Sequence, residues 1–363
     1  MDKERSQRFM RKVVGDIGTA MSAALVHVGD KVGLFKAMAG AGPVTAAELV
    51  DRTGIGMRYV EEWLAAMVCA EYVEYDAAGE TFTLPDEHAL FFTDPASEYY
   101  LGGMFAGLPG LMAVTPRVTA AFERGGGVSF SDFGEGLPVA LEQMNRSVYE
   151  SRLVRSWLPA LPDVVRRLET GGRAIDVGCG TGVVPILLAQ AFPSARIEGL
   201  DVDARSIGIA RGYARTAGVA ERVRFVVDTA QALSSSDGYD LVTTFDVIHD
   251  LPDPLDVLRR IRASLADGGT YLMVEPKVDD RLENNRDNPF CRMLFAISCL
   301  HCVPQSISQG GPGLGACWGP AKAREIAERA GFGSFETLPI RSPALAFYAL
   351  RKTAPAPDAT TRN

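Results

Sequence analysis

A glycine-rich turn is the feature of this chain whose residue types point most directly to chemistry. The sequence Arg-Ala-Ile-Asp-Val-Gly-Cys-Gly-Thr-Gly predicts a buried strand that ends near Asp176, followed by a turn at Gly178, Gly180 and Gly182. Glycines let the backbone approach a ligand, and the N-terminus of the helix that follows favours negative charge. Asp201 ends the next predicted strand, where a carboxylate suits the hydroxyl groups of a ribose. We therefore expect a nucleotide-like ligand at this turn.

The spacing of the glycines narrows the ligand further. The pattern is GxGxG, and it lacks the third glycine of the dinucleotide-binding fingerprint GxGxxG. The segment resembles the signature of the class I S-adenosylmethionine (SAM) methyltransferases, E/D-x-G-x-G-x-G, and its four positions are filled by Asp176, Gly178, Gly180 and Gly182. The resemblance implies that the turn holds the methionine part of SAM and that Asp201 holds the ribose. The product of the cofactor would be S-adenosylhomocysteine (SAH).

The same resemblance assigns further residues to the cofactor. Val202 should flank the adenine, and Phe245 at the end of the fourth strand should lie beside the sulfonium. Asp228 and Thr229 follow the third strand, where the resembling families use an acid to accept a hydrogen bond from the adenine amine. A helix N-cap is the other interpretation of Asp228. All of these positions follow strands, and open α/β sheets bind ligands at the carboxyl ends of their strands.

A histidine–aspartate pair lies where the methyl donor and the acceptor should meet. In plant phenolic O-methyltransferases, which this region resembles, such a pair supplies the general base, and a glutamate after the next strand orients it. His249, Asp250 and Glu275 match these positions. Histidine suits proton transfer because its pKa is near neutrality. The resemblance implies that these three residues are catalytic, and a purely structural loop histidine is the alternative.

A second histidine, His301, supports a different mechanism. The C-methyltransferases of α-keto acids, which the chain also resembles, bind a metal through two histidines, and His249 and His301 have a similar spacing. Imidazole is an ordinary ligand of iron and zinc, and two histidines leave a metal open to substrate. In this alternative both histidines are metal ligands, and the metal makes the acceptor carbon nucleophilic. If His249 is instead the general base, we expect no metal.

The N-terminal part of the chain predicts a winged helix. Apolar residues follow helical spacing over 7–40, and Thr45-Ala-Ala-Glu48 is a capping box that starts a short helix. A second helix should reach Ala70, and a hairpin should follow with strands near 72–75 and 81–84.

The charge of the winged helix argues against DNA binding. The segment Thr45–Thr83 carries eight acidic and two basic residues, whereas phosphate binding needs the opposite balance. Many SAM-dependent small-molecule methyltransferases, which this part resembles, use such a domain to dimerise and to help close the active site of the partner. We therefore expect a homodimer formed through the N-terminal domain. A SAM-responsive DNA-binding regulator is the alternative that the acidic surface disfavours.

Strands and helices alternate regularly after Gly172. Strands that alternate with helices predict a parallel, doubly wound sheet, and the short connection before the last strand forces an antiparallel pair. The fold class is therefore α/β, with a Rossmann-like seven-stranded methyltransferase sheet, an antiparallel last strand and an N-terminal, mainly α winged-helix domain. The predicted strands are 173–177, 196–200, 223–227, 239–244, 270–274, 333–338 and 344–350.

Composition limits the class of protein. The chain has 363 residues and a net charge of −8, which disfavours binding to nucleic acid. It has no uninterrupted run of about 18 apolar residues, so we expect no membrane span. The N-terminus is charged and does not resemble a signal peptide. The six cysteines in a chain of this length are typical of a reducing compartment, so we expect a cytoplasmic protein.

These observations together predict a SAM-dependent methyltransferase that acts on a small molecule in specialised metabolism. The whole chain resembles a group of bacterial winged-helix methyltransferases, and this resemblance is specific to the family and not to one reaction. The sequence identifies neither the substrate nor the O, N or C atom that accepts the methyl group. The expected domains are a winged-helix dimerisation domain (1–95), a helical connector and substrate lid (96–170), a SAM-binding domain (171–352) and a disordered tail (353–363).

Overall fold

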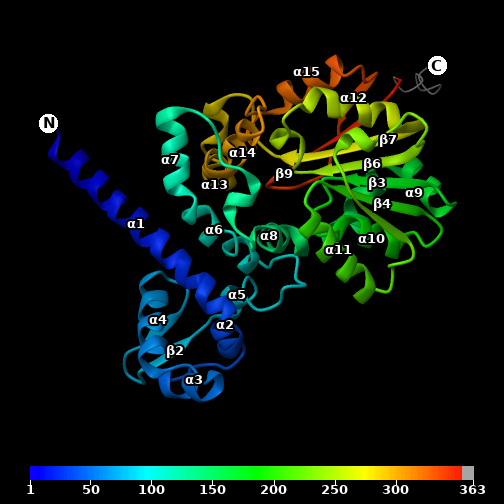
Figure 1. Ribbon diagram of the computed structural model, residues 1–363. Coiled ribbons are helices and arrows are strands. Elements are labelled where there is room, and N and C mark those ends of the chain that lie inside the picture. Colours follow the sequence, from blue (N-terminus) through cyan, green and yellow to red (C-terminus); the bar gives the residue numbers. More distant parts are fainter. Residues whose placement is uncertain (354–363) are drawn as a thin grey trace, which may run out of the picture. The chain divides into compact units, whose positions relative to one another are not determined.

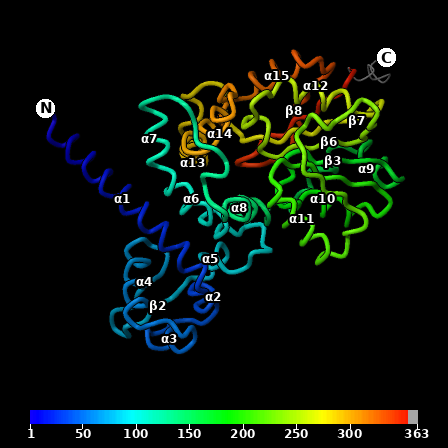
Figure 2. The backbone as a smooth tube through the Cα atoms, in the orientation of Figure 1, coloured from blue at the N-terminus to red at the C-terminus, as the bar shows by residue number. Residues whose placement is uncertain are grey.

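The computed structural model describes residues 1–353, so the predicted tail lies outside the described residues from position 354 onward. Figures 1 and 2 show the path of the chain, coloured along the sequence. The chain forms two compact units, and the predicted connector contributes residues to both of them. The domain boundaries expected from the sequence stay a prediction. Unit 1 comprises Met1–Pro109 and Gln143–Ser151, and unit 2 comprises Gly110–Glu142 and the chain from Arg152 onward.

Unit 1 contains the predicted winged helix. The capping box is formed, because Thr45 Oγ1 accepts from the backbone N–H of Glu48 at 3.2 Å and Glu48 Oε2 accepts from the N–H of Thr45 at 2.7 Å. The two short strands pair as an antiparallel hairpin. The elements are α1 (Lys3–Lys31), α2 (Leu34–Met38), α3 (Ala46–Thr53), α4 (Met57–Cys69), β1 (Glu74–Asp76), β2 (Thr81–Thr83) and α5 (Asp86–Ala89).

The core of unit 1 is built around Trp63. Its indole Nε1–H donates to the backbone carbonyl of Leu25 at 2.9 Å, and a Cβ on Gly29 would lie 2.4 Å from its ring. Phe35 packs edge-on against Trp63, with ring centroids 5.0 Å apart. Because Val26 and Gly29 are the buried residues of α1, this helix is held in unit 1 near its C-terminal end.

Helical segments follow the winged helix. A π-helical turn and a 3-10 turn interrupt the helical path near Pro159, where the sequence predicts a proline kink, and α9 starts at Pro162. The segments are η1 (Gly102–Phe105), α6 (Leu108–Ala113), α7 (Thr115–Arg124), η2 (Phe130–Phe133), α8 (Leu137–Arg152), η3 (Leu153–Trp157), η4 (Leu158–Ala160) and α9 (Pro162–Glu169).

A seven-stranded sheet organises unit 2, as the sequence predicts. The strand order is β5-β4-β3-β6-β7-β9-β8, and all pairs are parallel except those made by β9. The predicted α/β fold with an antiparallel last strand is therefore confirmed. The strands are β3 (Arg173–Val177), β4 (Arg196–Asp201), β5 (Val223–Val227), β6 (Tyr239–Phe245), β7 (Leu265–Pro276), β8 (Ser334–Thr337) and β9 (Leu345–Arg351).

Helices cover both faces of this sheet. Figure 1 shows α10 and α11 on one face and α12 and α15 on the other. Between the sheet and α12 and α15 lies a core that includes Ile261, Tyr271 and Ala327, which are all fully buried. This burial fixes the strand ends from which the candidate site is built. The helices are α10 (Val183–Ala191), α11 (Ala204–Thr216), α12 (Pro254–Ser264) and α15 (Pro320–Arg329).

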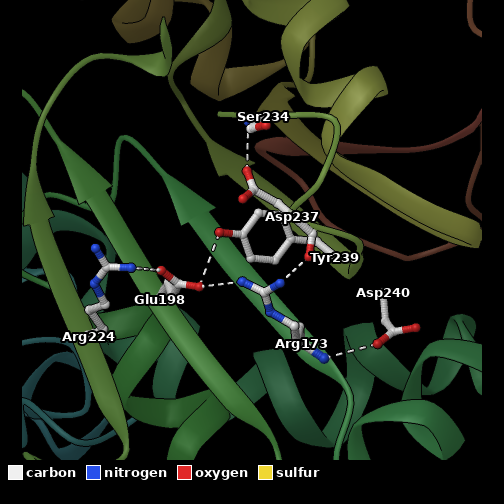
Figure 3. Close-up of polar contacts among 7 residues, drawn as sticks. All are labelled: Arg173, Glu198, Arg224, Ser234, Asp237, Tyr239 and Asp240. Carbon is white, nitrogen blue, oxygen red and sulfur yellow. Dashed lines mark hydrogen bonds and ion pairs between the residues drawn. The ribbon is translucent and has the colours of Figure 1, made fainter. Parts of the chain in front are cut away.

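A polar network ties the neighbouring strands β4, β3 and β6 together (Figure 3). Glu198 on β4 pairs with Arg173 on β3 at 3.0 Å and with Arg224 on β5 at 3.1 Å. The hydroxyl of Tyr239 on β6 donates to the same carboxylate at 3.1 Å. Burial raises the pKa of Tyr239, so this hydroxyl stays a donor at neutral pH. These contacts hold strand register and lie away from the carboxyl ends of the strands.

A cavity of about 690 Å³ lies at the amino-terminal edge of the sheet, where β7 begins and β9 ends. Its lining is rich in arginine, but Arg167 pairs with Asp240 at 2.9 Å and Arg351 pairs with Glu336 at 3.4 Å. Parallel α/β sheets bind their ligands at the opposite edge. The cavity is therefore not the candidate site.

One helical run, Pro289–Ser308, is long and apolar enough to cross a membrane by length and composition alone. Core helices of water-soluble proteins also meet these criteria, and 33% of the most apolar window is buried inside the structure. Ser306 Oγ donates to the backbone carbonyl of Leu251 at 3.1 Å, which ties the run to the loop after β6. The run consists of α13 (Pro289–Ile297), the π-helical turn η8 (Ser298–Cys302) and α14 (Val303–Ser308).

Candidate active site

The glycine turn between β3 and α10 has a backbone that other residues rarely adopt. Gly178, Gly180 and Gly182 have φ values of 74°, 51° and 81°. A Cβ on Gly178 would lie 2.5 Å from the side chain of Val247, and one on Gly182 would lie 2.7 Å from the ring of Phe225. A Cβ on Gly180 would meet nothing within 4 Å. The outer glycines are therefore required by packing, and the middle one faces open space that a ligand can enter.

Asp176 lies beneath this turn in the sheet. Its side chain is buried and accepts a hydrogen bond from Thr243 Oγ1 on β6 at 2.6 Å. Burial raises the pKa of Asp176 to about 7, and the nearby Asp201 adds to the shift. The structure therefore places Asp176 as a link between β3 and β6, from which it supports the turn.

Asp201 joins the end of β4 to the turn. Its Oδ2 accepts from the N–H of Gly180 at 2.8 Å, and its Oδ1 accepts from the N–H of Asp203 at 2.8 Å. Burial raises its pKa, and these backbone hydrogen bonds oppose that rise. A carboxylate offers about four acceptor positions, so capacity for two hydroxyl groups is left. The adjacent Val202 is 67% exposed, which leaves an apolar surface free beside it.

Asp228 and Thr229 lie next to this edge in exposed positions. The N–H of Asp228 donates to the carbonyl of Asp201 at 3.1 Å, so the ends of β5 and β4 are joined. Thr229, and not Asp228, is the N-cap of η5 (Ala230–Ala232), because its hydroxyl accepts from the N–H of Gln231 at 3.3 Å. The capping function thus belongs to Thr229. Within residues 1–353 the carboxylate of Asp228 accepts from the neighbouring N–H of Thr229 at 2.7 Å.

Phe245 ends β6, as the sequence predicts, and is 9% exposed. Its ring lies 6.1 Å from that of Trp157, with 27° between the ring planes. Trp157 in turn packs against Phe347 on β9, with ring centroids 4.9 Å apart. These aromatic rings form an apolar wall at the carboxyl end of the central strands.

His249 and Glu275 form a buried pair. His249 lies in η6 (Ile248–Asp250), the short turn after β6, and Glu275 lies near the end of β7. The carboxylate of Glu275 bonds His249 Nδ1 and also accepts from the N–H of Ile248 at 3.1 Å. Trp318 Nε1–H donates to the same carboxylate at 3.1 Å. With the Nδ1 proton directed at Glu275, Nε2 is the ring atom left for chemistry.

The charges around His249 favour its protonated form. Burial alone would lower the pKa of His249, but the carboxylates of Glu275 and Asp250 outweigh this effect and raise that pKa well above its ordinary value. Asp250 Oδ1 lies 3.4 Å from Nε2. The predicted triad of His249, Asp250 and Glu275 is thus brought together in space. An imidazole in such a position is a strong proton acceptor once its Nε2 proton has been lost.

His301 is close to this triad but has a different environment. It lies in η8, its side chain is buried, and its Nε2 has no hydrogen-bond partner among residues 1–353. Its ring packs against that of Phe133, with centroids 4.6 Å apart. Burial lowers the pKa of His301, so the ring is neutral at neutral pH. A buried neutral imidazole with a free nitrogen is a competent metal ligand.

Cys302 is a site residue that the sequence did not predict. Ligand atoms of His249, Asp250 and Cys302 all lie within 4.8 Å of one another. Burial raises the pKa of Cys302 to about 11, so this group is a thiol. The π-helical turn η8 places Cys302 and His301 in the same region. The CxxC spacing of Cys299 and Cys302 beside His301 is a sequence signal for metal ligands, but no pattern indicates the π-helical turn that contains Cys302.

The glycine-dense loop 309–319 lies against the site and positions Trp318. A Cβ on Gly311 would lie 2.4 Å from Ser306 Oγ and 2.8 Å from the Cα of Pro252, so this loop and the segment after η6 are in close contact. The N–H of Ala316 donates to Ser298 Oγ at 3.0 Å. The density of glycines in this stretch is typical of a tight loop, but nothing in the sequence indicates that its tryptophan bonds Glu275.

Known proteins share both parts of this architecture. Residues 148–306 match the family described as a methyltransferase domain, and residues 20–94 match the Rv2258c-like winged HTH domain. A ubiquinone biosynthesis O-methyltransferase of Aeromonas salmonicida is 32% identical over 99 residues, which are 27% of this chain and 41% of that protein. The trans-aconitate 2-methyltransferase of Streptomyces avermitilis is 28% identical over 44% of this chain and 57% of its own. The chain thus spans about half the length, or less, of these curated relatives.

Solved structures match over nearly the full length. A putative O-methyltransferase from Nostoc punctiforme has a TM-score of 0.71 at 20% identity, over 94% of this chain and 98% of its own. Human N-acetylserotonin methyltransferase, solved in complex with SAM, has a TM-score of 0.69 at 17% identity, over 98% and 99%. The fold is therefore a Rossmann-like methyltransferase fold. This chain carries a methyltransferase domain preceded by a winged helix-turn-helix domain, as its sequence predicts.

Proposed function

We propose that this protein is a SAM-dependent methyltransferase that acts on a small molecule. The observation that carries the proposal is the joint geometry of the glycine turn and Asp201. The turn leaves space at Gly180, and the carboxylate that anchors it keeps acceptor capacity for a ribose. The human structural neighbour is solved with SAM, which supports the same cofactor here. The six free cysteines favour a cytoplasmic location.

The remaining cofactor contacts extend along the carboxyl edge of the sheet. Val202 would contact the adenine, Asp228 would accept from its amine, and Thr229 would hold the short turn that carries this acid. Phe245 would cover the methionine part and the sulfonium. Asp176 on β3 would support the glycine turn from beneath, through its hydrogen bond with Thr243 on β6.

In the reaction, the methyl group passes in line from the sulfonium to the acceptor atom. Most of the rate enhancement comes from holding the two reactants in position and excluding water. Once its Nε2 proton has been lost, His249 would take the proton of the acceptor group through Nε2, while Glu275 holds Nδ1 and orients the ring. Asp250 faces Nε2 and stabilises the imidazolium that forms. His301 contributes a neutral ring to the same site.

Removal of the Asp201 carboxylate tests the cofactor assignment. We expect Asp201→Ala to weaken SAM binding by roughly 10²- to 10⁴-fold, because two hydrogen bonds to a charged acceptor are lost at about 1.5–3 kcal/mol each. Isothermal titration calorimetry with SAM measures the loss. Asp203→Asn is the matched control, because it removes a charge two residues away and keeps an N-cap. Wild-type affinity in Asp201→Ala contradicts the ribose assignment.

A metal-dependent C-methyltransferase of an α-keto acid is the second candidate function. Two observations favour it: the unpartnered Nε2 of His301, and the cluster of ligand atoms from His249, Asp250 and Cys302. This donor set of imidazole, carboxylate and thiol suits iron or zinc, and Glu275 bonds Nδ1 of His249 as the outer partner of a metal-bound histidine does. A metal would acidify the carbon next to the keto group. Stoichiometric metal in the purified protein would favour this candidate.

We also infer that the protein is a homodimer formed through α1. The N-terminal part of this helix exposes apolar side chains, including Phe9 (65% exposed), Ile17 (54%) and Met21 (67%). Exposed apolar stripes of this kind mark interaction surfaces. The small acidic winged helix beside α1 lacks the positive charge that DNA binding needs, so a second copy of the chain is the fitting partner.

Charge placed on this stripe should dissociate the dimer. We expect the double variant Ile17→Asp, Met21→Asp to sediment as a monomer at concentrations where the wild type is a dimer, because each aspartate would be buried in an apolar interface. Analytical ultracentrifugation measures the change. Thr19→Asp is the matched control, because Thr19 is exposed and lies about 200° around the helix from Ile17. A monomeric wild type contradicts the inference.

A further inference from the structure

Asp246, the residue that follows β6, has an unusual backbone conformation and an unpartnered buried oxygen in the described part of the chain. Its φ is 56°, in the left-handed region that residues other than glycine seldom occupy. Such backbone strain persists where the surrounding structure imposes it, and it is concentrated at ligand sites. Its N–H donates to the carbonyl of Val274 at 3.0 Å, so β7 holds the backbone in place. The strained residue is thus a fixed part of the carboxyl edge of the sheet.

One oxygen of the Asp246 carboxylate has no hydrogen-bond donor among the described residues. Its Oδ1 is shut off from solvent and has no hydrogen-bond partner in the described part of the chain. Burial raises the pKa of Asp246 to about 7, the carboxylates of Glu275 and Asp250 raise it further, and only His249 opposes them. His249 is itself bonded to Glu275. The positive charge of His249 is therefore shared with Glu275 and Asp250, and the buried Oδ1 of Asp246 needs a donor that a ligand can supply.

The position of Asp246 identifies the ligand group that can reach it. The next residue, Val247, packs directly against Gly178 of the glycine turn, so Asp246 borders the place where the methionine part of SAM is proposed to lie. The carboxylate of that methionine suits the free N–H groups and the positive end of the dipole at the N-terminus of α10. Its ammonium is attached to the same carbon and must find an acceptor nearby. Strand β6 is the neighbour of β3, and Asp246, which follows it, offers a carboxylate oxygen that is shut off from solvent.

We propose that Asp246 is a cofactor-binding residue whose carboxylate accepts the α-ammonium group of the methionine part of SAM. This proposal rests on the proposed function and adds to it the residue that recognises the amino-acid end of the cofactor. The ammonium supplies both the donor that Oδ1 lacks and the positive charge that the surrounding carboxylates lack. No bond is made or broken in this contact.

Two ligands that differ only in the amino-acid part test the proposal. SAH carries the ammonium, whereas 5′-methylthioadenosine keeps the adenosine and the sulfur but lacks the amino acid. We expect Asp246→Asn to weaken SAH binding by about 10- to 100-fold, as for the loss of a charge-assisted hydrogen bond, and to leave 5′-methylthioadenosine binding unchanged. Asparagine tolerates the left-handed backbone, so the variant should fold. Titration calorimetry with both ligands measures the four affinities.

Two further variants complete the experiment. Asp228→Asn, at the adenine end of the proposed site, should weaken both ligands equally. Asp246→Gly keeps the left-handed backbone without strain and should reproduce the selective loss of SAH if Asp246→Asn folds poorly. Equal effects of Asp246→Asn on both ligands, or none on SAH, overturn the assignment. If Asp246→Asn leaves the SAH affinity unchanged but reduces turnover at saturating SAM, Asp246 would act on the acceptor and not on the cofactor. This result would also overturn the proposal. A wild type that binds neither ligand overturns the proposed function itself.

Discussion

The His249→Ala variant should lose about 10²- to 10⁴-fold in kcat, which is the usual contribution of a general base, while its affinity for SAH stays near that of the wild type. The reason lies in the geometry. His249 bonds Glu275 through Nδ1 and presents Nε2 to the site, whereas the glycine turn and Asp201 hold the cofactor through other contacts. Turnover with labelled SAM and calorimetry with SAH measure the two quantities. Undiminished turnover would exclude His249 as the base.

Glu275→Gln is the informative companion of His249→Ala. The amide keeps the size of the side chain and a carbonyl oxygen that can still accept from His249, but it removes the charge that raises the pKa of His249. We expect an intermediate loss of kcat from this positioning residue. A loss as large as that of His249→Ala would mean that the two residues act as one unit.

His301→Ala separates the base mechanism from the metal mechanism. A base mechanism leaves turnover within about tenfold of the wild type in this variant, because the buried Nε2 of His301 has no hydrogen-bond partner among the described residues. In the metal mechanism, His301→Ala and His249→Ala both lose metal, as measured by elemental analysis, and both lose turnover. A metal-free wild type that is active in the presence of chelators would exclude the second candidate.

Much of the fold could be predicted from the sequence because the signals are local. The predicted strand 173–177 agrees with β3 residue by residue, and α10 follows the turn as predicted, since glycines with left-handed backbone separate the two elements. The capping box at Thr45 starts α3 for a similarly local reason. The antiparallel pairing of β9 was predictable because the connection before it is too short for a crossover.

The parts that could not be predicted depend on tertiary packing. The raised pKa of Asp246 arises from burial and from charges on β7 and η6, and nothing in the order of residues indicates it. Cys302 faces His249 and Asp250 because the helix is locally π-helical, whereas α-helical spacing gives no reason for His301 and Cys302 to serve the same site. The N-cap of η5 is Thr229 and not Asp228, because the boundaries of short helices are predictable only to within a residue or two.

Gly182→Ala should destabilise unit 2 by about 2–5 kcal/mol, the sum of about 1–2 kcal/mol for a left-handed alanine and about 1–3 kcal/mol for overpacking. The φ of Gly182 is 81°, and its Cβ would lie 2.7 Å both from Ala210 Cβ and from the ring of Phe225. Neither neighbour can move freely, because Ala210 is fully buried in α11 and Phe225 is buried in β5. Urea unfolding followed by circular dichroism measures the free energy of unfolding.

Gly180→Ala is the matched control, because it separates packing from ligand binding within the same turn. Its φ is 51° and its Cβ would meet nothing within 4 Å, so only the left-handed cost of about 1–2 kcal/mol applies. That Cβ would project into the space where the methionine part of SAM is proposed to lie. We therefore expect Gly180→Ala to lose more SAH affinity than stability, and Gly182→Ala to lose more stability than Gly180→Ala, by the overpacking cost of about 1–3 kcal/mol. Equal stability losses would mean that Phe225 and Ala210 adjust at no cost, and the packing explanation for Gly182 would be wrong.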